Sequence, residues 1–233
     1  DVIMSLAGRT QNPLPQIVPA RFGGFGGPAG LADFITREHI DAVVDATHPF
    51  AARMSANAVA ACVSTNTPLL SLRRPAWRQK PGDNWQCVTN YSQARTALGH
   101  DQKTVFLSIG RLNLSAFADL PQHSYIARTI DPPGDITLPP NIKFAHDRGP
   151  FDLPSELSFF KENAIDIIVS KNSGGTATYA KIEAARLLQR PVIMIDRPHK
   201  PSGNVFDKPE DVLNCLMAHA NTHHAMTFSD RGV

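Results

Sequence analysis

The sequence lacks most of the short signatures that would assign a chemistry directly. Its three cysteines, Cys62, Cys87 and Cys215, form no C-x-x-C pair, and its nine histidines form no H-E-x-x-H pattern. We therefore expect neither a zinc site nor a disulfide scaffold, and isolated thiols are typical of a reducing, cytoplasmic compartment. The phosphate loop G-x-x-x-x-G-K-[ST] and the nucleophile elbow G-x-S-x-G are also absent, which excludes those ATPases and hydrolases.

Long apolar runs and strong net charge are missing as well. No run approaches the roughly 18 apolar residues that a membrane-spanning helix needs, so we expect no membrane partner. The net charge of +2 is too small to favour nucleic acid as a partner. The chain has 233 residues, of which 42% are hydrophobic and 19% charged. These values are ordinary for a globular protein of one large or two small domains.

Short runs rich in Val, Ile and Leu predict strands that are buried on both faces of a parallel sheet. The predicted strands are 1–6, 40–45, 68–73, 104–109, 124–128, 165–170 and 191–196. Helical patterns lie between them at 29–38, 51–63, 92–99, 112–119, 155–163, 176–188 and 208–219. Strands that alternate with helices indicate βαβ units in a doubly wound sheet. The Pro-rich segment 132–147 is expected to be a loop.

The two halves of the chain repeat one pattern. The apolar runs 40–45 and 165–170 each lead into a polar loop, and Gly27-Pro28 matches Gly149-Pro150 at a spacing of about 120 residues. Matches in the same order at nearly one spacing indicate an internal pseudo-repeat. We therefore predict an α/β fold of two tandem Rossmann-like domains with parallel sheets, at 1–100 and 101–220. The tail at 221–233 is expected to be flexible.

The repeat also predicts that the first half lacks an element. The run Val105 to Gly110 opens the second half with a strand and a glycine turn that lead into a helix. The counterpart of this run in the first half would fall before residue 1. The sequence also begins without Met, inside a predicted strand. We therefore expect a fragment without its opening strand, turn and helix, with two halves that simply differ at this point as the alternative.

Basic residues gather where the predicted strands end. Ligands of open α/β sheets bind outside the carboxyl ends of the strands, so a basic rim there favours an anionic ligand, although any single member could be a solvated surface charge. The residues of this rim are Arg9, Arg73, Arg74, Arg111, Arg128, Arg148, Lys171, Arg197 and Lys200.

The segment from Ser5 to Thr10 follows the first predicted strand and contains Arg9 but no acid. NAD enzymes usually place Asp or Glu at this position to bind the ribose 2′-hydroxyl, whereas Arg accommodates the 2′-phosphate of NADP. The segment therefore favours NADPH, with a plain solvated turn as the alternative. Gly23 and Gly24 open a glycine cluster that could lie close to the cofactor or simply form a turn.

Two further loops carry candidate chemistry. Asp45, Thr47 and His48 follow a buried strand and precede a helix, where backbone N–H groups attract anions. In the second half, Lys171, Asn172, Ser173 and Gly174 form the matching loop, which suits an anion cradle. Asp45 could instead be a capping residue, and His48 a structural histidine.

Taken in order, the loops resemble one family. The matching motifs are S-L-A-G-R-T, G-G-F-G-G, D-A-T-H-P-F-A, the R-R-P-x-W of Arg73 to Trp77, the R-G-P-F of Arg148 to Phe151, and S-K-N-S-G-G. Together they are similar to the precorrin-6A reductases of cobalamin biosynthesis, over residues 1 to about 200. Family members open with a strand and a G-G-T-x-E-A-R-like loop that this sequence does not contain.

The resemblance implies that NADPH reduces one double bond of precorrin-6A to give precorrin-6B, with the macrocycle held between the two domains. The substrate is an anionic tetrapyrrole, and neighbouring enzymes of the pathway are further candidate partners. Candidate proton donors are His48, Lys171 and Asp45, in that order, with solvent as an alternative. Expected cofactor contacts are Ser5, Arg9, Thr10, Gly23, Gly24 and Thr47, and expected substrate contacts are Arg128, Arg148, Lys171, Asn172, Ser173 and Gly174.

Two other functions remain open at this point. One is the reduction of cobalt-precorrin-6A with NADH, against which the acid-free loop after the first strand argues. The other is a non-catalytic protein that carries a tetrapyrrole or a nucleotide, because Rossmann-like sheets host many functions.

Overall fold

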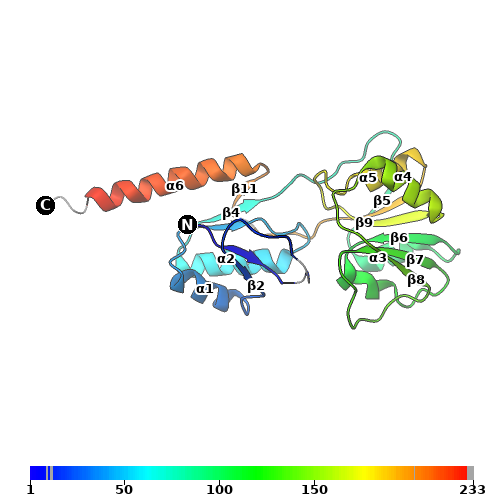
Figure 1. Cartoon of the computed structure of the whole chain (residues 1–233), viewed down its shortest axis with the longest axis horizontal. Helices are drawn as coiled ribbons and strands as arrows, with labels where there is room; N and C mark the ends of the chain where they lie inside the picture. The colour runs from blue at the N-terminus through cyan, green and yellow to red at the C-terminus, as the bar shows by residue number, and fades with distance from the viewer. Residues whose placement is uncertain (9, 11–12, 202, 230–233) are drawn as a thin grey trace. The chain divides into compact units, whose positions relative to one another are not determined.

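The computed structural model describes residues 1–8, 10, 13–201 and 203–229, with only the backbone for 222–229. The chain forms two compact units (Figure 1). Unit 1 comprises Asp1–Ala7, Val18–Pro75 and Pro198–Val233, and unit 2 comprises Gly8–Ile17 and Ala76–Arg197. Every strand pairing in the described ranges is parallel, and helices alternate with strands, so the expected α/β fold class is confirmed. None of the described helices combines the length and apolar character that crossing a membrane requires.

Unit 2 is built on a six-stranded sheet in the order β5-β10-β9-β6-β7-β8. Its strands are β5 Trp85–Val88, β6 Thr104–Ser108, β7 Ser124–Thr129, β8 Ile142–His146, β9 Ile167–Lys171 and β10 Val192–Ile195. The central strands are apolar along their length, and Val105, Phe106 and Leu107 of β6 are fully buried. Successive side chains of a strand point to opposite faces, so such runs require cover on both faces of the sheet.

The helices of unit 2 supply that cover in two groups. These helices are α3 Tyr91–Leu98, the 3₁₀ helix η1 Arg111–Phe117, α4 Leu153–Glu162 and α5 Ala180–Leu187. α4 packs with α5, and α3 packs with η1. Phe160 of α4 and Ile182 of α5 join Phe106 in one core cluster. Side chains cap the starts of α3 and α4. Asn90 accepts a hydrogen bond from the Gln93 N–H, and Asp152 accepts one from the Ser155 N–H.

Unit 1 carries two small parallel sheets. β1 Met4–Leu6 pairs with β2 Ala20–Phe22, and the order β11-β4-β3 joins Asn204–Phe206, Leu69–Leu72 and Val43–Asp45. Its helices are α1 Pro28–Arg37, α2 Ala52–Thr65 and α6 Pro209–Ser229. α1 packs on α2 through a core of Leu31, Ile35, Ala58, Ala61 and Cys62. Small residues on α2 allow the two helices to approach closely.

The two units divide the chain differently from the expected domains at 1–100 and 101–220. Residues 76–100 belong to unit 2, because β5 pairs with β10 at the edge of its sheet. Residues from Pro198 onward belong to unit 1, because β11 pairs with β4. Each half of the chain thus contributes an edge strand to the unit formed mainly by the other half.

The strands that sequence analysis missed are β2, β5, β8 and β11. Each lies at the edge of its sheet and keeps some side chains exposed, so none shows a continuous apolar run. The expectation of a loop at 132–147 was wrong at its end, because residues 142–146 form β8 and pair with β7. Of the tail expected from residue 221, residues up to Ser229 belong to helix α6, and residues 230–233 lie outside the described ranges.

Buried His123 should make unit 2 sensitive to mild acid. Its side chain is 1% exposed. Burial lowers the pKa of His123, with contributions from nearby Lys103 and then His100, and the Gly99 carbonyl offsets part of this effect. Because the folded pKa lies below the unfolded value of about 6.5, protonation favours the unfolded chain, and stability is lost as the pH falls through about 6.5.

Replacing His123 with Phe keeps a ring against Tyr125, which His123 contacts edge-on at 6.0 Å, and removes the titrating group. We expect the wild type to lose up to about 1.4 kcal/mol of unfolding free energy per pH unit below about pH 6.5, relative to His123→Phe. Both tryptophans, Trp77 and Trp85, lie in unit 2, so their fluorescence in denaturant titrations reports this change. The same pH dependence in both proteins would contradict the assignment.

Candidate functional site

Asp45 ends β3 and anchors the loop that follows. Its carboxylate is 4% exposed and accepts hydrogen bonds from the backbone N–H of Thr47 at 3.0 Å, from the Thr47 hydroxyl at 2.6 Å, and from the Ser55 hydroxyl of α2. Burial raises the pKa of Asp45, but hydrogen bonds from Ser55 and Thr47 and the charge of Lys200 outweigh burial and hold this pKa below its usual range. The carboxylate is therefore ionised at neutral pH, which suits an organising anion and argues against a proton donor.

Lys200 lies between β10 and β11 and contacts the same loop. Its buried ammonium donates to the Thr47 hydroxyl at 3.0 Å and to the His48 carbonyl at 3.4 Å, and lies 3.7 Å from the Asp45 carboxylate. Arg73, just after β4, donates to the carbonyl of Lys200 at 3.2 Å and to the carbonyl of Pro201 at 2.6 Å. Lys200 therefore shapes this loop directly, and Arg73 holds the segment that carries Lys200.

His48, the first candidate proton donor, has an exposed side chain. Its Nδ1 accepts a hydrogen bond from the Phe50 backbone N–H at 3.2 Å, and the two rings lie 5.8 Å apart. An imidazole nitrogen that accepts an N–H carries no proton, so the neutral ring holds its proton on Nε2.

The glycine-rich loop after β2 folds around Arg21, which no motif had marked. Nη1 of Arg21 donates to the Ser5 hydroxyl at 2.9 Å and to the Gly23 carbonyl at 3.1 Å, and Nη2 donates to the Gly24 carbonyl at 3.1 Å. Gly23 has φ 101°, a left-handed conformation that favours glycine. Three expected cofactor contacts, Ser5, Gly23 and Gly24, are thus brought together beside the carboxyl ends of β1 and β2.

The structure does not bring the other expected cofactor contacts, Arg9, Thr10 and Thr47, into this group. Arg9 falls outside the described residues. Thr10 lies in the segment Gly8–Ile17, which belongs to unit 2, whereas Thr47 belongs to unit 1. Within unit 1, Thr47 is held by Asp45 and Lys200 in the loop after β3.

The candidate site of unit 2 follows β9. Strands β6, β7 and β8 extend to one edge of the sheet and β9, β10 and β5 to the other, so β6 and β9 flank the switch point at which open parallel sheets bind ligands. A Cβ atom on Gly110 would lie 3.9 Å from the Lys171 ammonium, so this cation sits beside the turn after β6. Gly174 has φ 67°, which lets the loop after β9 turn sharply.

Asn172 fixes this loop to a distant segment of unit 2. Its Oδ1 accepts from the Trp77 backbone N–H at 2.8 Å, and its Nδ2 donates to the Trp77 carbonyl at 3.1 Å. The Trp77 indole N–H donates to the Gly175 carbonyl at 2.7 Å. Arg197 donates to the carbonyls of Asn172 and Ser173, at 2.8 and 3.1 Å. The Asn172 side chain thus positions the loop, and Ser173 and Gly174 form its tip.

Arg128, an expected substrate contact, has a largely buried side chain. Its guanidinium pairs with Glu156 of α4, and the two side chains are 10% and 1% exposed. The rings of Phe106, Phe151 and Phe159 lie 5.0, 4.2 and 4.5 Å from the guanidinium carbon. An ion pair enclosed by aromatic rings indicates an internal structural role for Arg128.

Lys181 adds a second buried cation to this network. It lies on α5, and its side chain is only 4% exposed. Its ammonium donates to the Thr178 carbonyl at 3.0 Å and lies 4.9 Å from the Trp77 ring. Burial lowers the pKa of Lys181 to about 7, although the charge of Glu156 opposes this shift.

Arg148 and Lys171 are therefore the expected substrate contacts in unit 2 whose charge best suits an anionic ligand. Both side chains are partly exposed, and they lie after β8 and at the end of β9. The backbone N–H of Arg148 donates to the Asp147 carboxylate at 2.7 Å, which fixes the start of its loop.

Comparison with known proteins identifies the relatives of this chain. Residues 1–217 match the family model described as "Precorrin-6x reductase CbiJ/CobK". The precorrin-6A reductase of Rhodobacter capsulatus is 44% identical over 223 residues, which cover 95% of this chain and 88% of that protein. The precorrin-6A reductase of a Sinorhizobium species is 48% identical over 205 residues, which cover 87% of this chain and 77% of that protein. A solved structure titled "CobK precorrin-6A reductase" superposes with a TM-score of 0.89 at 43% identity and covers 93% of this chain and 86% of its own.

The assignment of Arg128 to the interior predicts a loss of stability on its replacement. Arg128→Met leaves Glu156 as a buried carboxylate without its cation, so we expect the unfolding free energy of unit 2 to fall by about 3–5 kcal/mol. The double variant Arg128→Met, Glu156→Leu should recover most of this loss, because it removes both charges. An unchanged unfolding midpoint with a raised Michaelis constant for substrate would instead assign Arg128 to substrate binding.

Proposed function

The chain belongs to the precorrin-6x reductase CbiJ/CobK family, and on this premise we propose that it reduces precorrin-6A to precorrin-6B with NADPH. The observation that carries the proposal is the family match over residues 1–217, together with identities of 44% and 48% to curated precorrin-6A reductases. The reaction adds a hydride to one macrocycle carbon and a proton to its neighbour, and NADPH leaves as NADP⁺.

The choice of NADPH rests on the end of β1. The segment from Ser5 to Thr10 contains no Asp or Glu that would bind a free ribose 2′-hydroxyl. The Ser5 hydroxyl is held by the Arg21 guanidinium, and a hydroxyl beside a cation suits a phosphate oxygen. Ser5, Gly23 and Gly24 would therefore hold the adenosine end of the cofactor. When bound, the nicotinamide supplies the hydride, and the protein supplies orientation and electrostatics.

The substrate side of the proposal rests on cations at the strand ends. A tetrapyrrole with carboxylate side chains needs fixed positive charges and backbone N–H groups. In unit 2, Lys171 lies beside the switch point of the sheet, and the loop with Ser173 and Gly174 is pinned by Asn172 and Arg197. This loop is rigidly supported, so its donors are pre-organised for an anionic group.

His48 is the protein group that best fits the proton donor. Asp45 is held ionised by its hydrogen bonds, whereas the His48 side chain is exposed and would donate from its imidazolium form. Lys171 is the second candidate, and solvent is the alternative to both. A positioned general acid accelerates such a step by roughly 10²–10⁴-fold.

The proposal is tested by following NADPH absorbance after precorrin-6A is added to the purified chain. Substrate-dependent loss of NADPH with formation of precorrin-6B supports it. A parallel reaction with cobalt-precorrin-6A and NADH tests the other form of the pathway, and faster turnover there would overturn the choice of substrate and cofactor. Substrate binding without consumption of NADPH or NADH would indicate a carrier.

His48→Gln should lower kcat by about 100-fold or more at saturating substrate if His48 donates the proton. The amide cannot supply a labile proton of comparable acidity, but its oxygen can still accept the Phe50 N–H. Steady-state kinetics with both substrates varied give the measurement, and Lys171→Gln provides the same test of the second candidate. A kcat within about threefold of wild type in both variants would assign the proton to solvent.

A further inference from the structure

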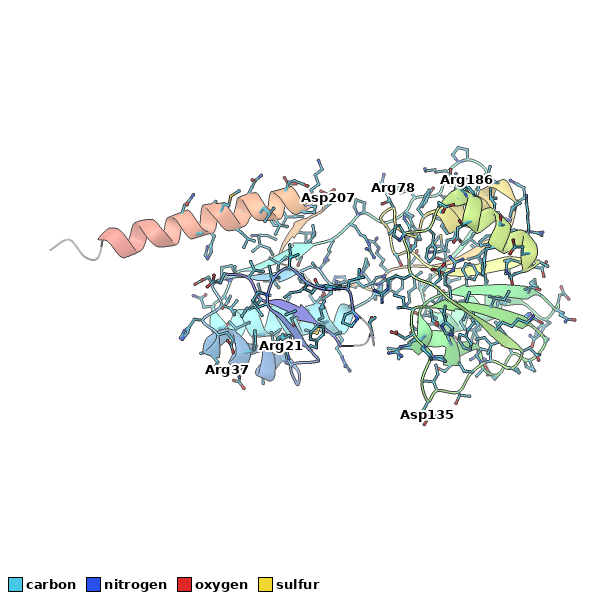
Figure 2. The ribbon with its side chains drawn as sticks, in the orientation of Figure 1. Arg21, Arg37, Arg78, Asp135, Arg186 and Asp207 are labelled. Carbon is cyan, nitrogen blue, oxygen red and sulfur yellow. The ribbon has the colours of Figure 1, made fainter. Side chains whose placement is uncertain are left out.

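Arg21 occupies an unusual position for an arginine in unit 1. It lies on β2, where Figure 2 labels it, and is in register with Ser5 on β1. Its guanidinium donates to one hydroxyl and two glycine carbonyls. No carboxylate among the described residues pairs with it, in contrast to Arg37, which pairs with Glu38 at 3.0 Å. The charge of Arg21 is therefore not neutralised by the described part of the protein.

The guanidinium is fixed by stacking as well as by hydrogen bonds. Its carbon lies 3.9 Å from the centroid of the Phe25 ring and 5.3 Å from that of Phe34, and the two rings meet edge to face at 5.2 Å. Phe25 is itself fixed against α1, because a Cβ atom on Gly30 would lie 1.8 Å from the Phe25 carbonyl oxygen. The close approach is possible only with glycine at position 30, so the ring beneath Arg21 has a defined place.

Two donors of Arg21 remain after these contacts. A guanidinium has five N–H groups, of which Nη1 uses two and Nη2 uses one in the contacts with Ser5, Gly23 and Gly24. The Nε–H and one N–H of Nη2 therefore have no partner among the described residues. Arginine binds phosphate through two N–H groups of this kind, and stacking on one face leaves its edge available.

Arg21 also sets the direction in which Ser5 donates. The Ser5 oxygen accepts the Nη1–H of Arg21 at 2.9 Å, so its own hydrogen is free to point to another acceptor. A hydroxyl that accepts from a cation is a stronger donor, because hydrogen bonds in a chain polarise one another. Ser5 and Arg21 thus form one donor group beside the ends of β1 and β2.

We infer that Arg21 is a specificity-determining residue that binds the 2′-phosphate of NADPH directly and orients the Ser5 hydroxyl toward the same phosphate. This inference rests on the proposed use of a nicotinamide dinucleotide by this chain. It assigns the phosphate to a side chain of β2, which the sequence motifs did not mark. The chain of contacts from Gly30 through Phe25 to Arg21 makes the site rigid before the cofactor arrives.

The test compares cofactors in Arg21→Gln and Arg21→Lys, with Arg37→Gln as the matched control. Arg37 is also an arginine near the Phe34 ring, at 5.5 Å, but its side chain is 67% exposed and pairs with Glu38. We expect Arg21→Gln to raise the Michaelis constant for NADPH by about 10–100-fold, with kcat and the constant for NADH changed by less than about threefold. Arg21→Lys should restore part of the loss, and Arg37→Gln should change neither cofactor constant.

A binding measurement without catalysis gives a second readout. Calorimetry should show that Arg21→Gln weakens adenosine 2′,5′-bisphosphate by about 10-fold or more and leaves adenosine 5′-monophosphate unchanged. Equal losses for both ligands would mean that Arg21 only maintains the loop, and unchanged affinities would mean that it does not reach the phosphate; either result overturns the inference. A wild type that does not distinguish NADPH from NADH would instead overturn the proposed cofactor.

Discussion

The loops of this protein depend on basic side chains that donate to backbone carbonyls. Arg21 holds two carbonyls of the glycine loop, Arg73 holds the segment at Lys200, and Arg197 holds the loop of Asn172. Loop carbonyls in such positions need donors, and a guanidinium supplies several in a fixed plane. The same cations leave a positive field at the strand ends, so they give each loop its shape and also its preference for an anionic ligand.

This arrangement explains how a small loop keeps a defined geometry through hydrogen bonds and neighbouring charges. Asp45 is a clear example, because a carboxylate buried to this degree would be costly without its donors from Thr47 and Ser55 and the charge of Lys200. The network keeps Asp45 ionised and leaves His48 exposed at the next turn. Burial and hydrogen bonding therefore make Asp45 an organising anion, and the proposed role of proton donor is left to His48.

The sequence was sufficient to predict the buried strands and to locate two loops of the candidate site. Buried strands such as β6 and β9 carry continuous apolar runs, whereas edge strands such as β5 and β8 contain exposed residues and show no such run. The loops of Asp45 and Lys171 were located by their motifs. The partners that shape them, Lys200 and Trp77, lie 155 and 95 residues away from Asp45 and Asn172, and no local pattern marks such contacts. Arg21 had one available signal, a basic residue two positions before a glycine cluster.

The central claim is that this chain transfers hydride from NADPH to a carbon of precorrin-6A. The most direct measurement is mass spectrometry of the product formed with NADPH that carries deuterium at both C4 positions of its nicotinamide. The account predicts that precorrin-6B gains one deuterium from the cofactor and one hydrogen from solvent. A reduced product without deuterium, in the presence of the intact labelled cofactor, would contradict direct hydride transfer by this protein.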